Sequence, residues 1–157
     1  METITPAPAC RHTRLQVTTR HPTEFIDLTE RLQLAVADAA LGVGILNVQT
    51  LHTTTAVIVN EHEPLLLADF ESLLTEVAPQ DAHYRHDDVA VRTVNVAPGE
   101  RPNGHAHCHA LLLAPSASLN VVNGRLQLGR WQRVFFVELD GPRVREVSAL
   151  VLGARAR

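Results

Sequence analysis

The chain contains no lysine, and all 14 of its basic residues are arginine. A Schiff-base lysine, a lysine general base and a lysine-bearing phosphate loop are therefore excluded. The arginines are scattered along a chain of net charge -3 and form no basic stripe, so we expect no nucleic-acid partner.

Long apolar runs and a cysteine framework are also missing. No run approaches about 18 apolar residues, and the first twelve residues are too polar and proline-rich for a signal peptide. The two cysteines, Cys10 and Cys108, lie far apart in sequence and do not suggest a disulfide framework. We expect a cytoplasmic protein with no membrane partner.

A length of 157 residues with 45% hydrophobic content suits one domain with its own core. We expect a flexible N-terminus over 1–13 and a single domain over 14–157. Caps and apolar periodicity predict two main helices. The first is capped by Thr29, runs to about residue 41 and is ended by the following glycines, and the second runs from Pro64 to about Pro79.

Strand signals dominate the rest of the chain. β-Branched residues predict strands over 14–19, 45–50, 54–60, 118–122, 125–128, 131–139 and 144–152. Asn123-Gly124 is a strong hairpin signal, so we expect a C-terminal β-meander. The polar stretch 80–104 is predicted to be mostly loop, with a short strand at 89–94. The fold class is α+β with a mostly antiparallel sheet.

Histidine is abundant, with nine residues gathered mostly in polar clusters. Neutral imidazole is the commonest metal ligand in proteins and the usual general base near neutral pH, so this abundance favours a functional site. Three polar segments carry it: 52–61, 83–88 and 103–109. A solvated histidine-rich loop that binds metal adventitiously is the alternative for any one of them.

Local geometry leaves the grouping of these histidines open. On a strand, His52 and Asn60 point the same way and Glu61 points the opposite way. In the third segment, a strand would place residues 105, 107 and 109 on one face, whereas a helix would pair only 105 with 109. No spacing matches a CxxC or HExxH zinc motif.

The C-terminal third adds weaker candidates. Trp131 is the only tryptophan, and a core or subunit contact competes with a substrate-binding role for it and for Gln132. The segment Asp140-Gly141-Pro142-Arg143 is most simply a turn, with Arg143 as a candidate anion contact.

Taken in order, these segments resemble one family. The matching motifs are His52-x-Thr54-x-Ala56, Asn60-Glu61, Tyr84-x-His86-Asp87, Asn103-Gly104-His105-Ala106-His107, Leu128-Gly129-x-Trp131-Gln132 and Glu138-x-Asp140-Gly141-Pro142-Arg143. Over roughly residues 14–152 the chain resembles the YjbQ-like family, also called the secondary thiamine-phosphate synthase family.

The resemblance implies a compact α+β fold that assembles as a homotrimer, with polar pockets near the subunit contacts. It implies a small-molecule substrate, with or without a phosphate group, and a divalent metal, zinc or magnesium. The implied residues fall into three groups: catalytic His52, Glu61, His86, Asp87 and His107; substrate-binding Asn60, Asn103, Ser116, Trp131, Gln132 and Arg143; and metal-binding His52, His86 and His107. His62, His83, His105 and His109 are weaker matches.

The activity implied by the resemblance is thiamine-phosphate synthase-like: coupling of an aminopyrimidine methyl diphosphate to a thiazole phosphate with release of pyrophosphate. Two other hypotheses stay open. One is a zinc-dependent hydrolase or lyase in which Glu61 acts as general base on bound water. The other is a trimeric metal-binding or small-ligand-binding protein without turnover.

Overall fold

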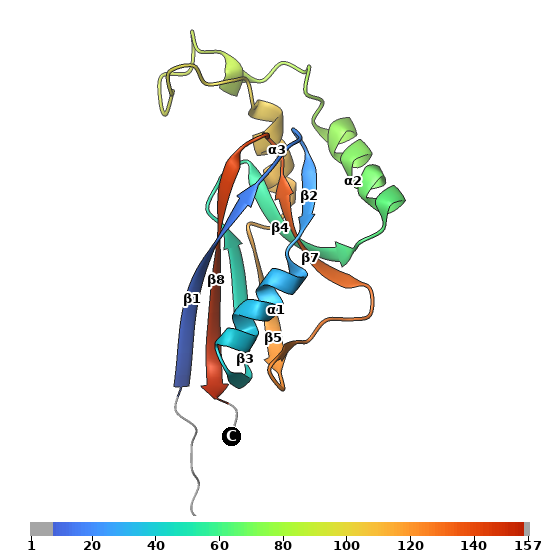
Figure 1. The fold of residues 1–157 in the computed structure, drawn as a ribbon. Helices are drawn as coiled ribbons and strands as arrows, with labels where there is room; N and C mark the ends of the chain where they lie inside the picture. Colours follow the sequence, from blue (N-terminus) through green and yellow to red (C-terminus); the bar gives the residue numbers. More distant parts are fainter. Residues whose placement is uncertain (1–7, 156–157) are drawn as a thin grey trace, which may run out of the picture.

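Antiparallel strand pairing organises residues 8–155, the part of the chain that the computed structural model describes (Figure 1). A five-stranded sheet has the order β1 (Pro8–Thr18), β8 (Val144–Arg155), β3 (Leu41–Thr50), β5 (Ser116–Val122) and β6 (Arg125–Leu126). A three-stranded sheet has the order β2 (Glu24–Asp27), β7 (Gln132–Glu138) and β4 (Thr55–Glu61). The helices are α1 (Thr29–Asp38), α2 (Pro64–Val77), α3 (Gly104–Leu112) and the 3₁₀ turn η1 (Arg85–Asp87). The α+β class and the mostly antiparallel sheet are confirmed.

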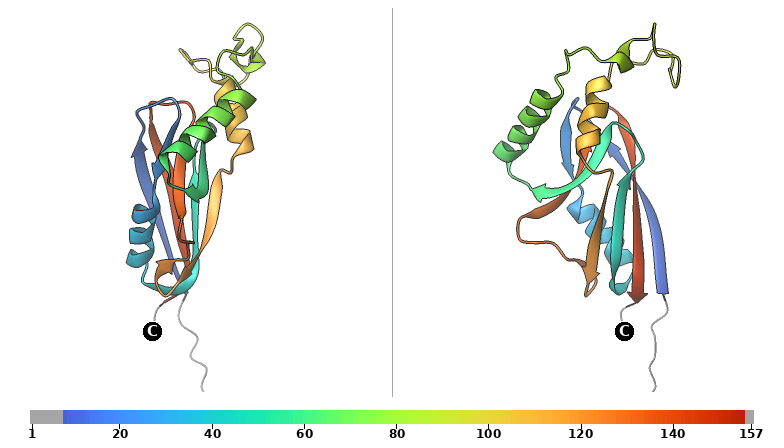
Figure 2. Two further views of the ribbon diagram at one scale, coloured as in Figure 1. Left: turned by 90° about the vertical axis from the view of Figure 1, so that its right-hand side faces the viewer. Right: turned by 180° about the vertical axis from the view of Figure 1, so that it is seen from behind.

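The apolar residues build two cores, one on each side of the three-stranded sheet. Helix α1 and one face of the five-stranded sheet bury Val36, Val48 and Phe136 in the first core. Helices α2 and α3 bury Leu74, Ala106 and Phe135 in the second. Phe135 and Phe136 enter different cores because successive strand residues point to opposite faces. Figure 2 shows α3 and the segment between α2 and α3 together at one end of the molecule.

Helix α2 forms as the apolar periodicity predicts. Pro64 is its first residue, and the Glu63 carboxylate accepts hydrogen bonds from the backbone N–H groups of Leu65 and Leu66. Within residues 8–155, no helix is long and apolar enough to cross a membrane.

Helix α1 ends earlier than predicted. Its last residue is Asp38, and Ala40 reverses the chain with a φ of 52° before β3 begins. Gly42 and Gly44 therefore lie inside a strand instead of ending the helix. Thr29 is the first helical residue rather than the cap: its hydroxyl accepts from the backbone N–H of Val134, and Asp27 accepts from the backbone N–H of Thr29.

The N-terminal part of the sheet is longer than predicted. Strand β1 begins at Pro8 and pairs with β8 along its whole length, so residues 8–13 belong to the sheet and not to a flexible N-terminus. Residues 1–7 lie outside the described part of the chain. Strand β2 was not predicted because its four residues show neither alternation nor a turn signal.

The expected C-terminal meander is wrong. The β5–β6 hairpin forms around Asn123 and Gly124, with φ angles of 52° and 72°, as the sequence predicts. Strand β7, however, leaves this sheet and pairs with β2 and β4. The physical reason is that five consecutive residues of β7 are buried, which requires a central strand covered on both faces.

The segment between α2 and α3 forms no strand at 89–94. Val89, Val91 and Val94 are exposed there, and no neighbouring strand satisfies their backbone. Arg92 holds the loop instead, donating to the carbonyls of His86 and Asn95 and to the Glu100 carboxylate.

A buried ion pair ties the two sheets together. Glu138 at the end of β7 is 0% exposed and Arg145 on β8 is 6% exposed. Arg145 donates through Nε at 2.7 Å and through Nη2 at 2.6 Å to the Glu138 carboxylate, and Nη2 also donates to the Thr54 hydroxyl. Glu138 also accepts from Thr19 and from the backbone N–H groups of Leu139 and Asp140.

Arg145→Met should lower the free energy of unfolding by about 3–5 kcal/mol, because it leaves a buried carboxylate without its cation. Urea unfolding followed by circular dichroism measures the change. The matched control is Arg14→Met, which removes an exposed pair with Glu146 at 3.8 Å and should cost less than about 1 kcal/mol. Equal losses in the two variants would contradict the assigned role of the buried pair.

Candidate functional site

Two predicted site histidines meet at the end of the molecule that carries α3. His86 comes from η1 and His107 from α3, and their rings pack edge-on with centroids 4.6 Å apart and planes at 64°. The nearest carboxylate is that of Glu100, whose Oε1 lies 3.8 Å from His86 Nε2. Within residues 8–155, His86 Nε2 is buried and has no hydrogen-bond partner. This buried nitrogen is therefore available to a ligand.

Asp87 fixes the two histidines relative to each other. Its Oδ1 accepts hydrogen bonds of 2.9 Å from the backbone N–H groups of both Asn103 and Gly104, at the start of α3. A carboxylate at this position also complements the positive end of the helix dipole. Asp87 is therefore an anchor between η1 and α3, and its role as a catalytic residue stays a prediction.

A network around Asp140 lies beside the histidine pair. The Asp140 carboxylate, 8% exposed, accepts from Asn103 Nδ2 at 3.2 Å, from Arg143 Nη2 at 2.8 Å and from Arg101 Nη2 at 3.4 Å. Asn103 Oδ1 is buried and has no partner within the described residues. The predicted residues Asn103 and Arg143 thus belong to one polar network with two arginines at its rim.

Electrostatics keep His107 neutral near pH 7. Burial lowers the pKa of His107, and the neighbouring His86 lowers it further. The hydrogen bond from Arg92 lowers the pKa of Glu100, which keeps that carboxylate ionised. The site therefore contains the neutral imidazole of His107, the imidazole of His86 and the negative charge of Glu100.

His52 does not join this pair. The backbone N–H of Glu146 donates to His52 Nε2 at 2.9 Å, so the ring proton of the neutral form lies on Nδ1. In this arrangement neither nitrogen offers a lone pair to a metal. Burial lowers the pKa of His52, and Arg145 contributes to the shift.

The predicted three-histidine metal set is therefore not assembled. His86 and His107 offer two imidazoles, whereas a zinc site takes three or four ligands. Within residues 8–155, no group of three or more His, Cys, Asp or Glu side chains has a geometry that could hold a metal ion. A resident metal does not fit this donor set without ligands from elsewhere.

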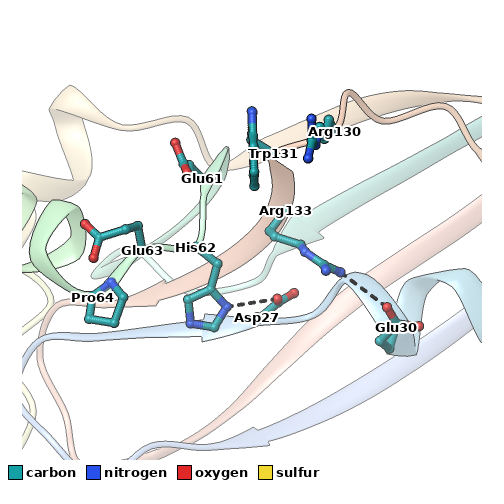
Figure 3. Close-up of a pocket in the computed structure, with 9 residues that line it drawn as sticks. All are labelled: Asp27, Glu30, Glu61, His62, Glu63, Pro64, Arg130, Trp131 and Arg133. Carbon is teal, nitrogen blue, oxygen red and sulfur yellow. Dashed lines mark hydrogen bonds and ion pairs between the residues drawn. The ribbon is translucent and has the colours of Figure 1, made fainter.

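Glu61 lies in a different cleft, of about 740 Å³, together with Trp131 (Figure 3). There His62 pairs with Asp27 at 3.2 Å, and Arg133 pairs with Glu30 at 3.3 Å (Figure 3). Glu61 ends β4, whereas His52 precedes its start, and six residue steps in a strand span about 20 Å. Glu61 is thus placed apart from His52, one of the histidines that it was expected to serve.

The remaining predicted substrate-binding residues are dispersed. Asn60 borders a small apolar hollow beside α2, and its side chain accepts from the backbone N–H of Glu61. Gln132 accepts from the backbone N–H of Gly129, and Ser116 begins β5 opposite Gln49.

The helical form of 104–112 settles which histidines share a face. His105 and His109 lie one turn apart with ring centroids at 5.8 Å, and His107 points elsewhere to meet His86. The sequence did not single out Arg92, Glu100 and Arg101, because loop residues follow no periodicity. The sequence pattern places Asp140 in a turn and in a family motif, and it lies two residues after the buried end of β7.

Fold and site together define a small two-sheet α+β protein with a histidine-bearing polar site at one end. The chain belongs to the family described as UPF0047 protein YjbQ-like, whose model matches residues 13–154.

Relatives of this family cover nearly the whole chain. A UPF0047 protein of Methanothermobacter thermautotrophicus is 37% identical over 139 residues, covering 88% of this chain and 90% of that protein. A YbjQ-like protein of unknown function from Sulfolobus solfataricus superposes with a TM-score of 0.84 at 28% identity, covering 94% of this chain and 99% of that one. A hypothetical protein from Aeropyrum pernix gives a TM-score of 0.80 at 35% identity, covering 91% and 98%.

These comparisons overturn the expected activity. The relatives are described only as UPF0047 proteins, and the solved structures as of unknown function or uncharacterised. The thiamine-phosphate synthase-like activity is therefore wrong as a property inferred from the family. Family membership establishes the fold, and evidence for the chemistry comes from the geometry of the site.

The imidazole of His107 should titrate below its ordinary pKa of 6.5, because burial and His86 both disfavour its charged form. The unfolded chain then binds more protons between the two pKa values, so the folded state loses stability as the pH falls through that window. NMR titration of the ring protons measures the midpoint. In the His86→Gln variant, the midpoint of the His107 titration should rise toward 6.5. The exposed surface variant His12→Gln should leave this midpoint unchanged. A midpoint at or above 6.5 in the wild type would refute the assignment.

Proposed function

We propose that this protein is an enzyme that catalyses acid–base chemistry on a small anionic substrate. His86 and His107 would exchange protons with that substrate. The observation that carries the proposal is the contact of two partly buried imidazoles, with centroids 4.6 Å apart, one of which has a buried nitrogen without a partner in the described chain. Such nitrogens in functional sites take a substrate, a water or an ion.

The two imidazoles suit the roles of base and acid. Two positive rings in contact repel, so protonation of one disfavours protonation of the other. Because the pKa of His107 is lowered, His107 is the base. His86 Nε2 lies 3.8 Å from the Glu100 carboxylate, and we assign His86 as the acid partner.

Arg101 and Arg143 support an anionic substrate. Each guanidinium is tied to Asp140, which holds it in position, yet their side chains stay 54% and 39% exposed. The guanidinium fork has five N–H donors, so each arginine keeps donors for a carboxylate or a phosphate. The shared ligand chemistry is a small organic anion, phosphorylated or carboxylated.

The function is tested by binding and turnover together. Calorimetry with inorganic phosphate and with acetate should show binding to the wild type, weakened about tenfold or more in Arg101→Gln because a charge-assisted contact is lost. Turnover is then followed by NMR over a set of small phosphate esters and carboxylates. With a substrate in hand, His107→Gln should lower kcat by about 10²–10⁴-fold and change KM little.

The matched control is His12→Gln, whose imidazole contacts Ser148 on the five-stranded sheet. It should retain binding and turnover. Absence of anion binding to the wild type at millimolar concentration would refute the substrate class. Unchanged kcat in His107→Gln would refute the acid–base role, and turnover that requires added zinc would favour a metal-assisted reaction at the same pair.

We also propose that copies of this chain assemble through the outer face of the five-stranded sheet, as the homotrimer implied by the family resemblance. Val43 and Ile45 on β3 are 60% and 49% exposed, and Leu152, opposite Ile45 on β8, is 51% exposed. Val122 on β5 lies opposite Val43 and continues the apolar strip. Contiguous exposed apolar surface of this kind is typical of a protein contact.

Ile45→Lys should disrupt this assembly, because it places an unpaired charge in the apolar contact. Sedimentation equilibrium of the wild type should give the mass of three chains, and the variant should dissociate at roughly hundredfold higher concentration or more. Gln16→Lys, on the polar part of the same face, is the control and should stay assembled. A monomeric wild type, or a fully assembled Ile45→Lys, would refute this interface.

A further inference from the structure

A second group of histidines lies on a different face of α3 from His107. His105 and His109 are 9% and 5% exposed, and their rings lie 5.8 Å apart with planes at 83°. Spacing of i and i+4 places both imidazoles over the same stretch of helix surface. The acid–base pair does not use these two side chains.

His109 has an unusual lack of partners. Within residues 8–155, both of its ring nitrogens are buried and neither has a hydrogen bond. A neutral imidazole carries one donor and one acceptor, so both polar groups have lost water without replacement. Buried polar atoms in folded proteins are nearly always satisfied, which points to a ligand at this position.

The space for a ligand is present beside these rings. A pocket of about 450 Å³ is lined by His105 and His109 from α3, by Glu71 and Thr75 from α2, by Gln80 and by His21. The rest of the lining thus offers a carboxylate and a third imidazole. Apart from main-chain groups, the polar lining is imidazole, carboxylate, hydroxyl and amide, with no arginine among these residues.

We propose that this pocket binds a divalent transition-metal ion through His105 and His109. Imidazole suits zinc, nickel and copper, and two histidines one helical turn apart form a common half of such sites. Because the described residues do not hold a preassembled set of three ligands, the coordination shell is completed by water or by Glu71 and His21 after side-chain movement.

The experiment is zinc binding to the untagged full-length chain after treatment with a chelator, measured by equilibrium dialysis and calorimetry. The wild type should bind one Zn²⁺ per chain at this site, and His109→Gln should weaken the affinity about tenfold or more through loss of a ligand. His107→Gln should retain the zinc site, which separates it from the pair with His86. His12→Gln is the surface control.

Circular dichroism checks that the variants fold. If His109→Gln fails to fold, His105→Asn provides a second test. Zn²⁺ at about a hundredfold excess over Kd should raise the Tm of the wild type by roughly 5–10 °C and leave His105→Asn nearly unaffected. The proposal is overturned if the wild type binds no zinc stoichiometrically, if both variants keep it, or if His107→Gln alone abolishes it.

Discussion

The buried pair of Glu138 and Arg145 is the interaction on which the geometry of this protein depends. A carboxylate at 0% exposure is tolerated only if its oxygens are fully occupied, and Glu138 accepts from Arg145, Thr19 and two backbone N–H groups. These bonds fix the turn that follows β7. Asp140 lies in that turn and holds Asn103 and the two rim arginines, so the position of the polar site follows from an ion pair that takes no part in its chemistry.

Helix α3 is the second constraint, because it distributes its histidines between two environments. Asp87 binds the first backbone N–H groups of the helix, and Asn103 is tied to Asp140, so both the start and the rotation of α3 are fixed. Helical periodicity then directs His107 toward His86 and turns His105 and His109 toward the pocket beside α2. A strand at this position would have placed all three imidazoles together.

Local signals predicted the elements that local forces decide. The proline and apolar spacing of α2, the Asn123-Gly124 hairpin and the β-branched strands could all be read from the sequence. The sheet to which β7 belongs could not be predicted from the sequence. Its five buried residues suit any strand that is covered on both faces, and only tertiary packing places it in the three-stranded sheet. In the site, histidine-rich segments indicated His86 and His107. The loop contact between Arg92 and Glu100 corresponds to no sequence pattern that could predict it. The order of the motifs along the chain also gave no sign that Glu61 lines a different cleft.

The hydrogen-bond partner of each imidazole shows what the abundance of histidine means. His52 accepts a backbone N–H and is thereby fixed in one tautomer, which removes it from metal binding. Within the described chain, His86 keeps one buried nitrogen without a partner, 3.8 Å from a carboxylate, and the proposed proton transfer rests on this nitrogen. Within residues 8–155, His109 has two ring nitrogens without a hydrogen-bond partner in a pocket that a second imidazole also lines, and a metal ion can take the place of those missing partners. The nine histidines are therefore not one cluster, and their chemistry is set by which nitrogen the fold leaves without a partner.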